Sequence, residues 1–226
     1  MHSTVTVSSE CGNVDRGQAG EGVLVQVSET AEISVPFVVR RPRLKELLYS
    51  DLVRQYEIEG RPGVQPNLLR FLGRLLHFRF LPTVFCRLSR AALMAGIPVV
   101  PKLLTYLNLV LFGLEVSPKC EIGPGIVFAH PVGCVIGAWR IGSRVTIYQG
   151  VGLGALRPDT GFHRELRCEI GDNVVLGAGC KVLGPYRVGD NATVGANSVV
   201  MSSVGPNQTV FGVPARVVPS STRASE

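Results

Sequence analysis

With 226 residues, the chain is long enough to bury one or two hydrophobic cores. Its 46% hydrophobic and 18% charged residues are typical of a globular protein and exclude a disordered one. The net charge of +6 suits an anionic small-molecule ligand. We expect no nucleic acid as a partner, because no basic run is interleaved with aromatic residues.

Residues 1–41 are rich in Ser, Gly, Val and Glu and are predicted to form a partly disordered N-terminal arm. They contain no apolar core of the signal-peptide type, so we expect a cytoplasmic protein. The most apolar stretch, 88–114, is interrupted by two prolines and a lysine, which argues against a membrane-spanning helix. The six cysteines include no C-x-x-C pair, which fits a reducing compartment and predicts no zinc site.

Residues 42–114 are predicted to form an α-helical domain. The segment LKELLYSDLVRQY, which begins at Leu44, places four apolar side chains on one helical stripe. The turn residues GRPG at 60–63 end this helix. Three more helical segments are expected to follow, at 67–80, 83–96 and 101–113.

Between residues 115 and 205 the apolar pattern changes to a period of six. A period of six predicts a three-sided solenoid, in which each hexad supplies one side and points its aliphatic residue inward. This part of the chain is therefore predicted to be a parallel β-helix, with a loop at 155–169 and a C-terminal tail at 206–226. Three series of aliphatic residues follow the period: Val116, Ile122 and Phe128; then, after a one-residue slip, Val135, Ile141, Ile147 and Leu153; and finally Ile170, Leu176, Val182, Val188, Val194 and Val200.

Small residues accompany the aliphatic ones. A glycine often follows the aliphatic residue, and we expect it to permit backbone angles that a side chain would forbid. Two positions before the aliphatic residue, a small side chain fits the narrow core. This pattern explains Cys120, Cys168 and Cys180 as packing residues rather than catalytic thiols.

The segments EVSPKCEIGPGIVFAHPVGCVIG, IGSRVTIYQGVGLGA, IGDNVVLGAGCKVLG and GVPARVV resemble the hexapeptide-repeat acyltransferases, and among them the serine acetyltransferases. The resemblance implies a left-handed parallel β-helix and a homotrimer, or a dimer of trimers, with active sites between subunits. It implies acetyl-CoA as co-substrate and no permanently bound cofactor or metal. The implied reaction, part of cysteine biosynthesis, transfers acetyl to the hydroxyl of serine or a related small acceptor.

His130, in the slip of the repeat, matches the catalytic histidine of this family. An alcohol must lose its proton as it attacks a thioester, and an imidazole can remove that proton near neutral pH. Glu115 stands where the family has the aspartate that orients this histidine. The resemblance therefore implies His130 as general base and Glu115 as its partner.

The resemblance also implies residues that bind the two substrates. Asp51 matches an acid that contacts the acceptor, and two loop residues, His163 and Arg167, lie where the family has a further histidine. The residues implied to bind CoA are Gly154, Ala155, Ala178, Ala196 and Arg216.

Two departures from the family pattern bear on the acceptor and on partners. Ala129 replaces the acid before the catalytic histidine, which helps to hold serine, so the acceptor stays open between serine and another hydroxyl compound. The chain ends in STRASE, whereas members that dock into cysteine synthase end in isoleucine. We therefore do not expect that complex.

Other functions stay open. The chain could acetylate a sugar or an antibiotic, which an acceptor screen would reveal, or it could be a trimeric scaffold that binds no CoA. A carbonic anhydrase of the γ class is disfavoured, because the four histidines lack the spacing of a three-histidine zinc site: His2, His77, His130 and His163.

Overall fold

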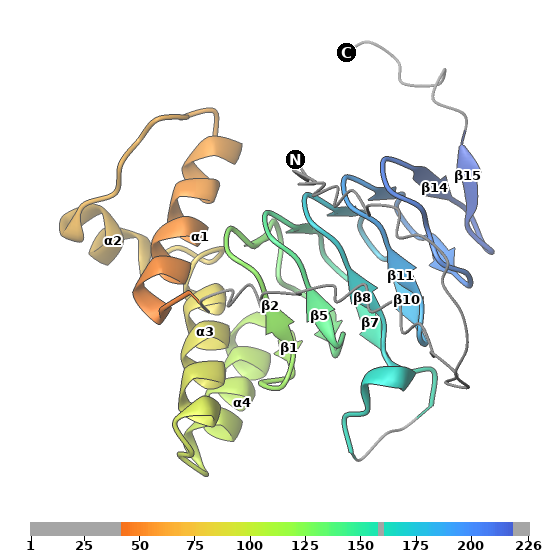
Figure 1. Cartoon of the computed structure of the whole chain (residues 1–226). Coiled ribbons are helices and arrows are strands. Elements are labelled where there is room, and N and C mark those ends of the chain that lie inside the picture. Colours follow the sequence, from red (N-terminus) through yellow and green to blue (C-terminus); the bar gives the residue numbers. More distant parts are fainter. Residues whose placement is uncertain (1–41, 158–160, 219–226) are drawn as a thin grey trace, which may run out of the picture. The chain divides into compact units, whose positions relative to one another are not determined.

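The computed structural model describes residues 42–157 and 161–218, so the interpretation of residues 1–41 as an arm lies outside the described residues. Helices come first and short strands follow, winding into a parallel β-helix (Figure 1). This order confirms the predicted fold class. The helices are α1 (Leu44–Ile58), α2 (Leu68–Arg74), α3 (Leu81–Met94) and α4 (Val100–Phe112), and the loop after β7 holds the short 3₁₀ helix η1 (Arg164–Leu166).

The helix boundaries follow from residues that suit helix ends. The Asn67 side chain accepts a hydrogen bond of 3.0 Å from the backbone N–H of Arg70 and so caps α2. Prolines stand in the first turns of α3 and α4, where no backbone N–H is needed. Gly113 ends α4 in the left-handed conformation. The helix expected over 67–80 ends at Arg74, and residues 75–80 form a turn segment.

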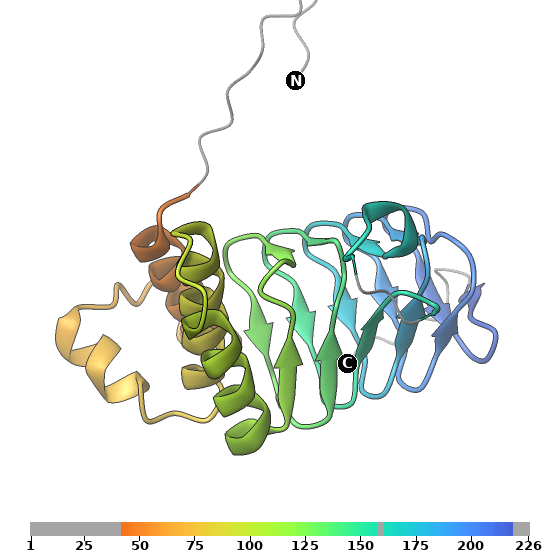
Figure 2. The same cartoon turned by 90° about the horizontal axis from the view of Figure 1, so that it is seen from below.

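Three sheets make the sides of the solenoid, and each coil except the last contributes one strand to each sheet (Figure 2). Sheet A consists of β1 (Leu114–Val116), β4 (Cys134–Ile136), β7 (Gly152–Gly154), β10 (Lys181–Leu183) and β13 (Val199–Val200). Sheet B consists of β2 (Glu121–Ile122), β5 (Arg140–Ile141), β8 (Glu169–Ile170) and β11 (Arg187–Val188). Sheet C consists of β3 (Val127–Phe128), β6 (Thr146–Ile147), β9 (Val175–Leu176), β12 (Thr193–Val194), β14 (Thr209–Phe211) and β15 (Arg216–Val218). The last coil adds β13 to sheet A and β14 to sheet C, and β15 then pairs antiparallel with β14.

The core consists of aliphatic residues that stack on their equivalents in the next coil. In sheet C, for example, Ile147 pairs with Leu176, and Leu176 pairs with Val194. All three side chains are fully buried. Burying one such side chain stabilises the fold by about 1.5–3 kcal/mol, so the repeat accounts for most of the cohesion between coils. The stacking continues at Val210 in β14, so residues 209–218, which the sequence assigned to the tail, extend sheet C.

The structure corrects the inward residue predicted at 135. Val135 is 51% exposed, whereas Ile136 is 1% exposed and pairs with Leu153 in the core. The prediction was wrong because we counted six residues back from Ile141. The step from Ile136 to Ile141, which is one side of a coil, has five residues instead of six. The segment around His130 is correspondingly longer than the one-residue slip suggested.

The glycines that follow the aliphatic residues are needed for a different reason from the one expected. Their φ angles lie outside the left-handed region at residues 123, 142, 171, 177, 189 and 195. A Cβ at Gly189 would instead lie 2.5 Å from the backbone nitrogen of Pro206 and 2.8 Å from the carbonyl carbon of Gly205. The corners of adjacent coils are in backbone contact, so a side chain has no room.

We expect Gly189→Ala to destabilise the protein by about 1–3 kcal/mol, because neither backbone can move away without breaking the coil. Gly73→Ala is the matched control, since a Cβ there would meet no atom within 4 Å and Gly73 lies in α2. That change should stabilise the protein by about 0.5–1 kcal/mol. Urea unfolding followed by circular dichroism measures both, and equal effects of the two substitutions would contradict the close contact.

The five cysteines in the described part of the chain are buried and form no disulfide: Cys86, Cys120, Cys134, Cys168 and Cys180. Burial raises the pKa of the Cys168 and Cys180 thiols to about 12. A thiol of this kind stays protonated at neutral pH and is a poor nucleophile. The cysteines therefore act as small core residues.

Candidate functional site

One edge of the solenoid, where sheet C turns into sheet A, carries His130; we call it the His130 edge. Backbone hydrogen bonds join its successive corners. Gly150 N–H donates to Val132 at 3.0 Å, Gly179 N–H to Gln149 at 2.8 Å, and Asn197 N–H to Ala178 at 2.7 Å. His130, Ala178 and Ala196 therefore lie along one edge, with the corner of Gln149 and Gly150 between those of His130 and Ala178.

His130 lies in the segment between β3 and β4, and its side chain is exposed. The Phe78 ring, from the turn segment before α3, is stacked against the imidazole, with 6.1 Å between ring centroids and 25° between planes. Glu115 is exposed in the middle of β1 and pairs in register with Val135 of β4. Glu115 thus lies within sheet A and His130 at the edge where that sheet begins, and among the described residues no hydrogen bond or ion pair joins the two side chains.

The edge between sheets A and B carries the other predicted residues; we call it the loop edge. The loop leaves it after Gly154 and returns at Arg167, which forms a β-bridge with Ala155. Arg167 Nη1 donates a hydrogen bond of 2.7 Å to the Gly137 carbonyl, and its guanidinium lies 4.0 Å from the centroid of the Phe162 ring. His163 Nδ1 lies 3.6 Å from Glu165 Oε1. Arg167 therefore helps to hold the loop against the solenoid.

A single chain does not bring all the predicted residues together. Sheet A separates the His130 edge from the loop edge, so His130 and the two alanines lie on one side, and Gly154, Ala155, His163 and Arg167 on the other. Arg216 lies in β15, at the last coil, with an exposed side chain. A site that uses both groups requires the edges of two chains.

Asp51 was expected to contact the acceptor, and the structure places it in the interior, with no exposed surface. Its carboxylate accepts hydrogen bonds of 2.8 and 3.0 Å from Arg87, and of 2.9 and 3.0 Å from the backbone N–H groups of Gly125 and Ile126. Burial raises the pKa of the Asp51 carboxyl, against the opposing effect of the Arg87 charge. Both oxygens have protein donors, so Asp51 here joins α1 to the first coil.

A cluster of charged and aromatic side chains next to Phe78 was not predicted. Arg74 forms a two-pronged ion pair with Glu59, which lowers the pKa of the Glu59 carboxyl. The His77 ring is stacked on Phe78 at 5.1 Å, and burial lowers the pKa of His77. Arg79 lies 5.2 Å from the centroid of the Phe78 ring. Sequence spacing gave no signal for these contacts, because they depend on the turn at 75–80.

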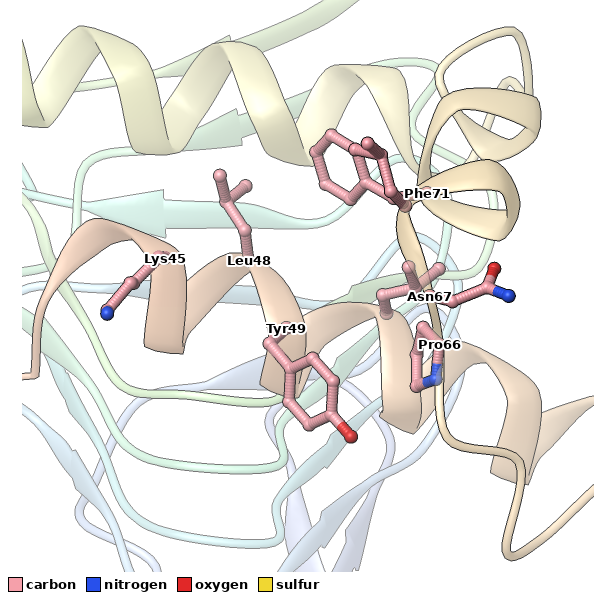
Figure 3. A pocket seen from close by; sticks show the side chains of 8 residues that line it. Lys45, Leu48, Tyr49, Pro66, Asn67 and Phe71 are labelled. Carbon is pink, nitrogen blue, oxygen red and sulfur yellow. The ribbon is translucent and has the colours of Figure 1, made fainter.

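An apolar groove of about 330 Å³ opens between α1 and the start of α2, which is within the size range of small-molecule sites (Figure 3). Its walls include Leu48, Tyr49 and Phe71, with Lys45 at the rim. A second, more polar hollow of about 340 Å³ lies beside the loop edge and is lined by Arg167, Tyr186 and Arg187 among others. His130 lines neither of them.

Comparisons with known proteins bear on this arrangement. Residues 167–202 match the family model described as bacterial transferase hexapeptide (six repeats). The chain is 42% identical over 123 residues to a serine acetyltransferase of Synechococcus elongatus, which covers 54% of this chain and 49% of that protein. The soybean serine acetyltransferase structure is 31% identical, covers 79% of this chain and 70% of its own, and has a TM-score of 0.67.

The chain belongs to the serine acetyltransferase family. A serine acetyltransferase solved in complex with CoA has the same fold, at 28% identity and a TM-score of 0.66, covering 77% of this chain and 69% of its own. The chain spans about half the length of the curated serine acetyltransferases that it matches.

Within residues 42–157 and 161–218, no cluster of three or more His, Cys, Asp or Glu side chains could hold a metal ion. In the same ranges, no helix has the length and apolar character needed to cross a membrane.

Proposed function

We propose that the protein is an acetyl-CoA-dependent O-acetyltransferase that acts on serine or a related small hydroxylated acceptor. The observation that carries this proposal is the exposed imidazole of His130 on the edge that also bears Ala178 and Ala196. Relatives that share this fold are serine acetyltransferases, and one was solved with CoA. Acetyl-CoA is a co-substrate in this proposal, and no permanently bound cofactor is required.

In the proposed reaction, His130 removes the proton of the acceptor hydroxyl while the oxygen attacks the thioester carbonyl. The resulting oxyanion needs preorganised donors, for which backbone N–H groups near Gly154 are suited. The intermediate collapses by breaking the carbon–sulfur bond, and the protonated His130 returns the proton to the CoA sulfur. Glu115 accepts a hydrogen bond from the second ring nitrogen and stabilises the imidazolium that forms.

We propose a homotrimer as the working assembly, in which the His130 edge of one subunit meets the loop edge of its neighbour. The two edges lie apart on one chain, so a site that contains both takes one edge from each of two subunits. In a trimer with cyclic symmetry this contact occurs three times. Sheet B is suited to face solvent, because Glu121 faces Arg140, and Arg140 and Arg187 both face Glu169 on its outer surface. The outer positions of β6, β9 and β12 in sheet C are uncharged: Thr146, Val175 and Thr193.

In this trimer, CoA would lie in the groove between subunits. Ala178 and Ala196 of one subunit and Gly154 and Ala155 of the next would line its pantetheine arm. A Cβ on Gly154 would meet nothing closer than 3.9 Å, so the backbone at this point leaves open space. Arg216, exposed at the last coil, would meet the CoA phosphates, since guanidinium groups bind phosphate well. His163 and Arg167 would reach the acceptor from the neighbouring loop.

Serine is the first acceptor to test, and Ala129 keeps a different hydroxyl compound open. The experiment combines acetyl-CoA with serine, with serine analogues that lack the amine or the carboxylate, and with sugars and hydroxylated antibiotics. Free thiol release and mass spectrometry of the product measure transfer, and calorimetry measures CoA binding. Transfer to serine would make Ala129 a tolerated change, whereas CoA binding with transfer to another acceptor would identify that acceptor. A protein that binds no CoA would be a scaffold, and the proposal would be abandoned.

We also propose that the protein is located in the cytoplasm. Five buried free thiols fit a reducing compartment, which supports a cytoplasmic protein.

A further inference from the structure

The turn segment 75–80 connects α2 to α3 and presents Phe78 to His130. Backbone hydrogen bonds of 2.9 Å, from His77 N–H to Arg74 and from Phe80 N–H to His77, fold the segment tightly. Phe80 has no exposed surface and packs edge-on against Phe71 at 5.5 Å. The anchored Phe80 fixes the backbone, so the position of Phe78 two residues earlier is set by the helical domain.

Phe78 is not a core residue. Its side chain is 46% exposed, although the ring has three neighbours: His130 at 6.1 Å, His77 at 5.1 Å and the guanidinium of Arg79 at 5.2 Å. About half of Phe78 is buried, so the ring contributes some packing energy, but an exposed ring of this size is not accounted for by packing alone. What the ring does contact is the imidazole that the proposed function assigns as general base.

We infer that Phe78 is a positioning residue for His130, an inference that rests on the proposed function. An exposed histidine side chain rotates among several rotamers, and only some of them aim a ring nitrogen at the acceptor hydroxyl. Stacked aromatic rings prefer one relative geometry, so Phe78 raises the fraction of His130 side chains in the productive orientation.

The contact also links the helical domain to catalysis. Phe78 comes from the turn before α3, and His130 from the β-helix, some fifty residues later in the sequence. A base that is held from a separate element keeps its orientation when the substrates enter and leave. The helical domain therefore does more than cover the first coil.

The test compares Phe78→Ala, Phe78→Tyr and the control Leu76→Ala. Leu76 lies in the same turn segment, with 92% of its side chain exposed, and no contact with His130. We expect Phe78→Ala to lower kcat about five- to tenfold with little change in the KM for acetyl-CoA, because orientation of the base is lost and CoA binding is not. Phe78→Tyr keeps an aromatic ring and should have a kcat close to that of wild type, and Leu76→Ala should leave kcat unchanged. Phe78→Ala is expected to unfold at a somewhat lower temperature than Leu76→Ala, because Phe78 is about half buried and Leu76 is 92% exposed, so rates are compared well below both unfolding temperatures.

A second measurement does not depend on the acceptor. Phe78 shifts the NMR signals of the His130 ring protons through its ring current, and these signals are assigned by their loss in His130→Gln. We expect the signals to move in Phe78→Ala, to stay in Phe78→Tyr, and to be unaffected by Leu76→Ala. Unmoved signals, or an unchanged kcat in Phe78→Ala where His130→Ala is inactive, would overturn the inference. If the ring signals move while His130→Ala keeps full activity, the contact between Phe78 and His130 is confirmed, but His130 is not the general base and the proposed function fails.

Discussion

Replacing His130 by alanine should lower kcat for acetyl transfer about 10²–10⁴-fold, the range found when a general base is removed. The loss is expected in kcat, because the proton must leave the hydroxyl in the transition state. Initial rates of thiol release, with the acceptor and acetyl-CoA each varied, measure the effect. Binding of CoA by calorimetry should stay unchanged.

The controls separate chemistry from folding. The His130 side chain is exposed, so His130→Ala should change the free energy of unfolding by no more than about 0.5 kcal/mol. Glu115→Gln keeps the shape of the partner and removes its charge, and it should reduce kcat less than loss of the base does. Activity of His130→Ala within about tenfold of wild type would exclude His130 as the base.

The architecture could be predicted because the solenoid repeats one local rule. Each inward aliphatic residue stacks on the residue in the next coil, so a period of six in the sequence reports directly on a contact in space. The prediction failed at Val135, because counting in steps of six assumes that every side of a coil has the same length. The side that follows His130 has a different length. The segment around His130 is a place where the repeat is irregular, so the precise register there required the structure.

The site could be predicted only in part. His130 was proposed because it lies in the slip of the repeat and matches the catalytic histidine of the family, and the loop at 155–169 was expected because the repeat is interrupted there. Phe78 gave no signal, since its contact with His130 joins segments that no sequence period relates. The burial of Asp51 was not predicted, for a physical reason: a carboxylate on a helix suggests solvent or a ligand, and nothing in the spacing shows that Arg87, 36 residues away, is buried against it.

Removing the Asp51 carboxylate is expected to destabilise the protein by about 3–5 kcal/mol. Asp51→Ala would leave the Arg87 guanidinium, which is buried with Asp51, without its counter-charge. Two backbone N–H groups, those of Gly125 and Ile126, would lose their acceptor as well. Arg87 also donates to the Ile122 and Gly123 carbonyls at 2.6 Å each, so the pair holds the first coil against the helices. Urea unfolding at one fixed protein concentration measures the loss.

The comparison that decides the role of Asp51 uses three further variants. Glu57→Ala removes ion pairs with Arg54 and Arg144 at the surface and should change the free energy of unfolding by about 0–1 kcal/mol. Replacing the buried pair together, as Asp51→Leu with Arg87→Met, should recover much of the stability lost in Asp51→Ala, because no lone charge stays buried. Arg87→Met alone should be as unstable as Asp51→Ala. If Asp51 served the acceptor instead, Asp51→Ala would raise the acceptor KM while unfolding stayed the same, because a residue that binds a ligand is not needed to hold the first coil.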